Sequence, residues 1–123
     1  MQYNSIEIVN DEDFIIKHRI QAEDTIGYDD LSTYTDSELK IYNATTKELE
    51  YTANGLNSVA DTITIDDVVY GVVKSTIPAN TLTPKYDGID RGYMPLNAYY
   101  GVLTVEFSDR DDVNVVIDRI VVV

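Results

Sequence analysis

Two segments near the C-terminus alternate apolar and polar side chains with a period of two. Residues 99–107 place Leu103 and Val105 on one face and Thr104 on the other, and residues 113–123 are almost continuously β-branched. Successive side chains of a strand point to opposite sides of a sheet, so this pattern predicts strands, here joined as a long antiparallel hairpin. No window of ten or more residues carries apolar side chains at helical spacing. The chain is therefore confined to an all-β fold.

The same period recurs along the rest of the chain, between short clusters of turn residues. It predicts further strands at residues 13–20, 37–43, 48–53, 62–65 and 68–77. Asn54-Gly55 and Asp66-Asp67 are turn signals, and Pro78 ends a strand because proline donates no hydrogen bond to a ladder. Short strands separated in this way predict an immunoglobulin-like antiparallel β-sandwich of seven to nine strands.

The length of the chain predicts one domain spanning residues 1–123, since 123 residues can enclose one sizeable core. Residues 23–35 and 79–97 lack strand periodicity and are predicted to be connections. The second is longer than most loops of compact domains, and loops of that length often carry function. It is the first candidate for a contact surface.

The charge of the chain disfavours several classes of partner. It has 22 Asp and Glu against 9 Lys and Arg, a formal net charge of −13, and its basic residues are scattered singly. Such a surface repels phosphate backbones and anionic lipids, so we expect neither a nucleic-acid nor a membrane partner. The first twenty residues lack a basic segment followed by an apolar run, and we expect synthesis in the cytoplasm without an export signal.

Residues with catalytic or metal-binding chemistry are sparse. There is no cysteine, and the single histidine, His18, shares the face of its predicted strand with apolar residues, which indicates a packed side chain. Pairs of aspartates, at 29–30, 66–67 and 111–112, fall at predicted turns, where aspartate is favoured by local hydrogen bonding. Residues 109–114 resemble a calcium loop but lack the glycine and closing glutamate of an EF-hand. We expect no enzyme activity, catalytic residue, cofactor or metal.

Ten tyrosines and no tryptophan give the chain an unusual aromatic composition. Several lie in or beside the long loop, and tyrosine provides much contact area for little conformational entropy. Packing in the core and contact with a partner explain this set equally well. The candidate protein interface comprises Tyr86, Arg91, Tyr93, Tyr99 and Tyr100.

The order of these segments resembles the immunoglobulin-like β-sandwich domains of tailed-phage virion proteins, such as the N-terminal domain of upper baseplate proteins. The matching positions are Asp30-Leu31-Ser32, Ile77-Pro78 with Leu82, and the run from Tyr100 to Val105. The likeness covers about residues 12 to 123, and the chain departs from it in the long segment 83–97. The resemblance implies a structural virion protein of the tail, neck or baseplate. Its implied partners are other virion proteins in a symmetric homo-oligomer, with no cofactor.

Two other functions fit the same sequence. A carbohydrate- or ligand-binding β-sandwich module predicts a monomer with an exposed row of tyrosines. A hydrolase requires two carboxylates that converge in a deep cleft.

Overall fold

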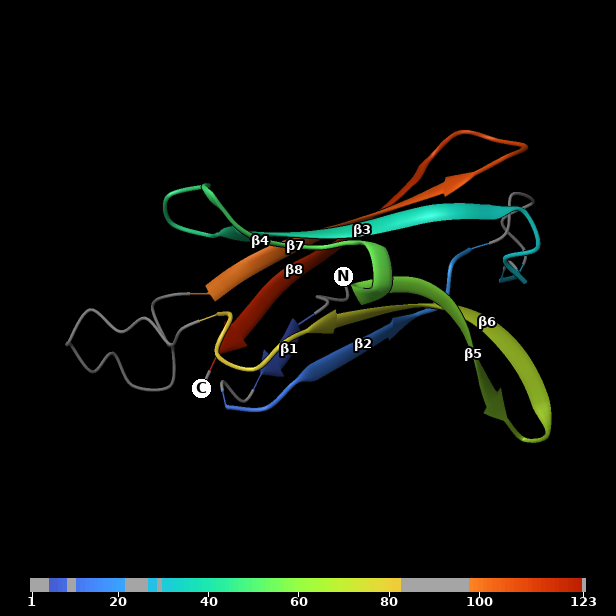
Figure 1. Ribbon diagram of the computed structural model, residues 1–123, viewed down its shortest axis with the longest axis horizontal. Coiled ribbons are helices and arrows are strands. Elements are labelled where there is room, and N and C mark those ends of the chain that lie inside the picture. The colour runs from blue at the N-terminus through green and yellow to red at the C-terminus, as the bar shows by residue number, and fades with distance from the viewer. Residues whose placement is uncertain (1–4, 9–10, 22–26, 29, 83–97, 123) are drawn as a thin grey trace.

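The computed structural model describes residues 5–8, 11–21, 27–28, 30–82 and 98–122 (Figure 1). These residues form eight strands, within the predicted range of seven to nine, and one short 3₁₀ turn at Gly55–Asn57. The strands are β1 Ser5–Ile8, β2 Phe14–His18, β3 Tyr34–Asn43, β4 Leu49–Ala53, β5 Ser58–Ile65, β6 Val68–Ile77, β7 Ala98–Phe107 and β8 Val113–Val122. None of the described residues belongs to a helix long and apolar enough to cross a membrane.

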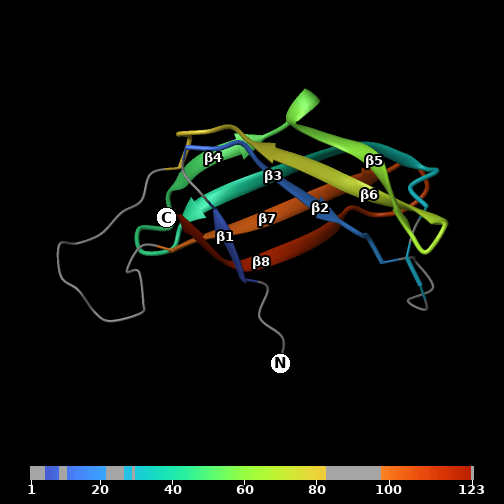
Figure 2. The ribbon, with the colours of Figure 1, turned by 90° about the horizontal axis from the view of Figure 1, so that it is seen from below.

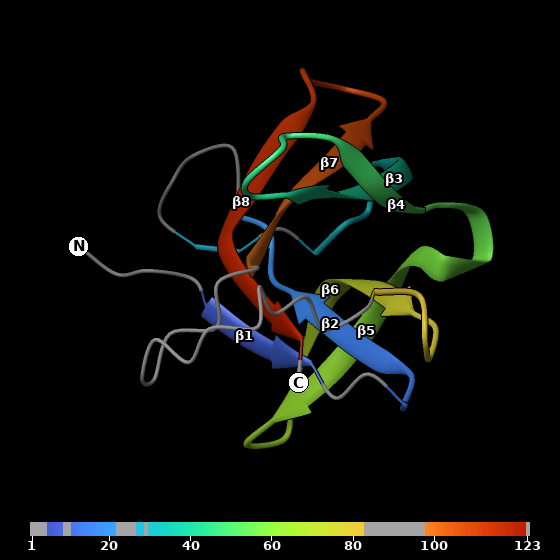
Figure 3. The ribbon, with the colours of Figure 1, turned by 90° about the vertical axis from the view of Figure 1, so that its left-hand side faces the viewer.

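The strands form two sheets that face each other, as the end-on view in Figure 3 shows. One sheet has the order β1-β8-β7-β3-β4 and the other the order β2-β6-β5; every neighbouring pair is antiparallel except β1 with β8. In an immunoglobulin variable-type sandwich, strands G, F, C and C′ form one sheet and B, E and D belong to the other. Strands β8-β7-β3-β4 and β2-β6-β5 follow those two orders, so the predicted immunoglobulin-like sandwich is confirmed.

The core lies between the two sheets and is filled by aliphatic side chains. Leu39 and Ile41 of β3, Leu103 of β7 and Ile117 of β8 are fully buried and belong to one cluster with Ile16 of β2. Immunoglobulin domains commonly join strands B and F by a disulfide. This chain has no cysteine, and Ile16 of β2 and Leu103 of β7 belong instead to the same apolar cluster.

A buried chain of hydroxyl groups also joins the sheets. The Oγ atoms of Ser37 in β3 and Ser58 in β5 are hydrogen-bonded at 2.7 Å, and the Tyr34 hydroxyl lies 2.7 Å from Ser37 Oγ. Hydroxyls buried without a partner destabilise a fold, so these contacts compensate for placing polar groups between the sheets. They also fix β5 against β3.

The N-terminal strand β1 was not predicted from the sequence. It pairs in parallel with β8 over Ser5–Ile8, opposite Arg119–Val122. Residues 113–122 carry apolar side chains at both odd and even positions, and an uncovered edge of that kind promotes aggregation. The pairing with β1 covers this edge from within the same chain.

Two predicted connections differ in the structure. Strand β3 begins at Tyr34, inside the segment 23–35 that was predicted to lack strands, and a bulge follows Tyr34 in its pairing with β7. Pro78 does end β6, and the chain then turns to bring Leu82 into the core. The remainder of the predicted loop, residues 83–97, lies outside the described residues.

Candidate interaction surfaces

The structure separates the two described members of the predicted tyrosine interface. Tyr99 is only 1% exposed and belongs to the core, so its side chain offers no surface to a partner. Tyr100 points to the opposite side of β7, where its ring stacks on Tyr42 at 5.0 Å with Lys47 above it. The other three predicted residues, Tyr86, Arg91 and Tyr93, lie outside the described residues.

The outer side of sheet β2-β6-β5 carries a row of basic residues, and we call it the basic face. Lys17 of β2 lies directly opposite Lys74 of β6, and Arg19 follows on the same side of the chain. Three of the nine basic residues of the chain therefore meet on one small sheet. No ion pair joins any of them to a described residue. The single outward carboxylate on these strands is Asp61 of β5, opposite Val72.

Exposed apolar side chains flank this basic row at both ends. Ile15 of β2 is 47% exposed at one end, and the cross-strand pair of Ile65 and Val68 is 43% and 49% exposed at the other. Figure 2 shows this side of the molecule, with β2, β6 and β5 nearest the viewer. The face thus combines cations with apolar contact area on a chain that is acidic elsewhere.

The outer side of the other sheet carries the opposite charge, and we call it the acidic face. Asp36 of β3 lies directly opposite Glu106 of β7, and Glu38 follows two residues later on the same side of β3. These three carboxylates line a shallow depression of about 110 Å³. Lys40 is paired with Glu38 at 3.3 Å, which neutralises only one of the three.

Arg19 lies between two aromatic rings at one end of the basic face. Its guanidinium carbon is 3.7 Å from the ring centre of Tyr28 and 4.0 Å from that of Tyr70. Cations over aromatic faces are held by the ring quadrupole, so both tyrosines fix the direction of this side chain. Sequence reasoning missed this cluster because Tyr28 and Tyr70 are far apart in the chain and only the fold brings them together.

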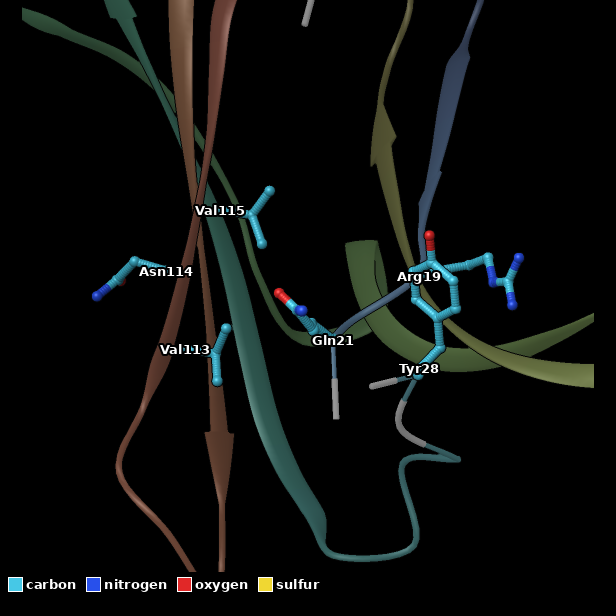
Figure 4. A pocket seen from close by; sticks show the side chains of 7 residues that line it. Arg19, Gln21, Tyr28, Val113, Asn114 and Val115 are labelled. Atoms are coloured by element: carbon cyan, nitrogen blue, oxygen red, sulfur yellow. The ribbon is translucent and has the colours of Figure 1, made fainter. Parts of the chain in front are cut away.

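Beside Arg19 the two sheets leave an open cleft of about 460 Å³. In Figure 4 the amide of Gln21 points across it toward Val113 and Val115 of β8, while the guanidinium of Arg19 points away beside Tyr28. Among the described residues, the cleft is thus lined by polar side chains, Gln21 and Asn114 among them, and by the two valines of β8.

His18 faces the core from the end of β2, as predicted, and burial lowers the pKa of its imidazole below the ordinary value of 6.5. Its Nε2 atom is buried and has no hydrogen-bond partner among the described residues. Protonation of His18 in the folded state would bury a positive charge, whereas in the unfolded state the imidazolium is solvated by water. The unfolded state therefore binds a proton at His18 more readily.

This linkage predicts the pH dependence of stability. The contribution of neutral His18 to the free energy of unfolding is fully present above about pH 6.5. We expect this contribution to be lost as the pH falls from about 6.5 toward the lowered pKa of the folded state. Urea unfolding from pH 8 to pH 5 should show the wild type losing stability relative to His18→Gln. Parallel curves for the two proteins would contradict this expectation.

The acidic residues that the structure describes do not assemble into a metal site. Within the described part of the chain no group of three or more His, Asp and Glu side chains has an arrangement that could hold a metal ion, and this part includes residues 109–114. The carboxylates of the acidic face lie in a shallow depression on an outer sheet surface.

Comparison with known proteins adds little about function. No family model matches the chain, and no curated protein matches it. A solved structure of murine CRIg is similar over 97% of this chain and 90% of that chain, with a TM-score of 0.43 and 16% sequence identity.

Proposed function

We propose that this protein is a non-enzymatic assembly module that binds other protein subunits through the outer surface of its sandwich. One observation supports this most directly: the basic face exposes Ile15, Ile65 and Val68 on a single sheet. Ile65 and Val68 are adjacent, Ile15 lies at the far end of the sheet, and exposed apolar area rimmed by polar residues is typical of protein interfaces. The half-buried Tyr70 adds aromatic surface of the kind enriched at such contacts.

The specific role that we propose is a structural protein of a tailed-phage virion, in the tail, neck or baseplate. Support comes from the sequence resemblance described above, because two of its matching segments pack against or belong to strand β6. Leu31 lies against Gly71, and Ile77-Pro78 forms the end of β6. In this proposal the chain is made in the host cytoplasm and joins other virion proteins as a symmetric homo-oligomer.

The experiment for this role is to identify the proteins of purified tailed-phage particles from the source bacteria by mass spectrometry. We expect the chain in the particles at a stoichiometry of several copies or more. Its absence from intact particles, together with its presence in the soluble fraction of the host, would contradict the virion role.

A carbohydrate- or ligand-binding module is the second candidate. The cleft between Gln21, Val113 and Val115 supports it, because ligand sites are concave and mainly apolar with a few oriented polar groups. This alternative predicts a monomer that is retained on a glycan array. A Gln21→Leu variant should then lose binding, because the amide that points across the cleft would be gone.

A further inference from the structure

The basic and acidic faces each place like charges directly opposite one another. Lys17 faces Lys74 across β2 and β6, and Asp36 faces Glu106 across β3 and β7. Like charges at directly opposed positions destabilise a sheet. The chain has 22 acidic residues that could have been placed beside Lys17 or Lys74. On β2, β5 and β6, however, Asp61 is the single acidic residue. A counter-charge from outside the domain would relieve each arrangement.

The two faces are complementary in more than charge. Ile15, Ile65 and Val68 flank the cations, and the acidic face carries the exposed Val116 of β8 together with the stacked rings of Tyr42 and Tyr100. Both surfaces are antiparallel sheets, and sheets pack face to face at a spacing of about 10 Å when their side chains interdigitate. The Lys17, Lys74 and Arg19 row can therefore lie over the carboxylates of a similar sheet.

We propose that the basic face of one copy docks on the acidic face of a second copy of this chain. The inference rests on the proposed function as an assembly module and names its contact and partner. The charge complementarity between the two faces identifies the second copy as the occupant, because the chain itself contains the acidic sheet surface that the cations require. Lys17 and Lys74 lie over Asp36 and Glu106 of the neighbour.

The positions of the two faces determine the kind of assembly. They lie on opposite sides of the sandwich, since each is the outer surface of a different sheet (Figures 1 and 3). A contact between unlike surfaces is heterologous, so each added copy leaves one basic and one acidic face free. The assembly therefore grows beyond a dimer, into a ring or a linear stack.

Two double variants test the contact, with sedimentation velocity of the purified full chain as the measurement. Lys17→Glu with Lys74→Glu makes both faces acidic, and Glu38→Lys with Glu106→Lys makes both faces basic. We expect the wild type to associate beyond a dimer at about 20 mM salt and to dissociate toward monomer at about 500 mM. Each double variant alone should associate at least about tenfold more weakly than the wild type.

Mixing the two variants provides the decisive measurement. The acidic face of one variant then meets the basic face of the other at both contacts, so the equimolar mixture should recover assemblies of wild-type size. A single Lys74→Glu variant is compared with an Asn54→Asp, Leu56→Glu double variant, which changes the net charge equally but lies in the exposed connection between β4 and β5, away from both faces. The Asn54→Asp, Leu56→Glu variant should keep association, and Lys74→Glu should weaken it. Circular dichroism melting verifies that every variant is folded.

The outcomes separate this inference from the proposed function. A wild-type chain that stays monomeric at low salt, or a variant mixture that fails to reassemble, overturns the contact between copies. If the same chain is nevertheless found in purified particles, the assembly role stands and the basic face serves a different acidic protein. Equal weakening by the Asn54→Asp, Leu56→Glu variant and by Lys74→Glu also overturns the contact, because general repulsion would then explain both.

Discussion

Replacing Tyr99 by alanine is expected to lower the free energy of unfolding by about 3 to 5 kcal/mol, the range for truncating a large buried aromatic side chain. Tyr99 is 1% exposed and belongs to the cluster that includes Ile120 of β8 and Leu39 of β3. Truncation removes its apolar burial and leaves a cavity that rigid strands on both sides cannot close. Urea denaturation followed by circular dichroism measures the change.

The neighbouring residue provides the matched control. Tyr100 lies on the other side of the same strand, half-buried, with its ring stacked on Tyr42. Tyr100→Ala should cost about 1 kcal/mol, mainly the stacking contact. A similar loss of stability for both variants would contradict the assignment of Tyr99 to the core and Tyr100 to the surface.

Replacing Gly71 by alanine is expected to destabilise the protein by about 1 to 3 kcal/mol, as overpacking does in a tight interior. A Cβ atom at this position would lie 2.8 Å from the backbone oxygen of Asp30 and 3.2 Å from Cγ of Leu31. Leu31 has a φ of 62° and is buried, so this segment cannot move aside without losing its own packing. The added methyl group therefore fits only if the backbone of β6 shifts away from residues 30 and 31.

Gly27 is the control for the glycine substitution. A Cβ atom at that position would meet no heavy atom within 4 Å, so Gly27→Ala should change the stability by less than about 0.5 kcal/mol. Thermal melts of the two variants side by side give the comparison. Equal effects would show that the loss of stability at Gly71 arises from replacing any glycine by alanine and not from the contact with residues 30 and 31.

The strands were predictable because half-buried strands have a local signature. Residues 68–77 were predicted as one strand and form β6 with those bounds, and the predicted strand at 48–53 corresponds to β4 at Leu49–Ala53. Strand β1 escaped prediction because its four residues gain their pairing from β8, more than a hundred residues later. The start of β3 at residues 34–36 was missed because Asp36 looks like a turn residue, yet pairing with β7 holds it in a strand.

The candidate site was less predictable than the fold. The sequence does not distinguish a tyrosine in the core from one on the surface. The register of β7 with its neighbours directs the side chain of Tyr99 inward and that of Tyr100 outward. The basic face was missed because Lys17 and Lys74 are isolated in the sequence. The scattered basic residues led the sequence analysis to expect no basic patch, and the pairing of β2 with β6 corrects that expectation.

The sequence alone determined the all-β class, the antiparallel terminal hairpin and the strongly acidic charge, because side-chain alternation and composition are properties of neighbouring residues. The tertiary structure decided which strands became neighbours, which edge β1 covers, and that Lys17 meets Lys74 on one sheet while Asp36 meets Glu106 on the other. Strand order depends on contacts between segments far apart in the chain, and those contacts form only when both sheets bury their apolar sides against each other.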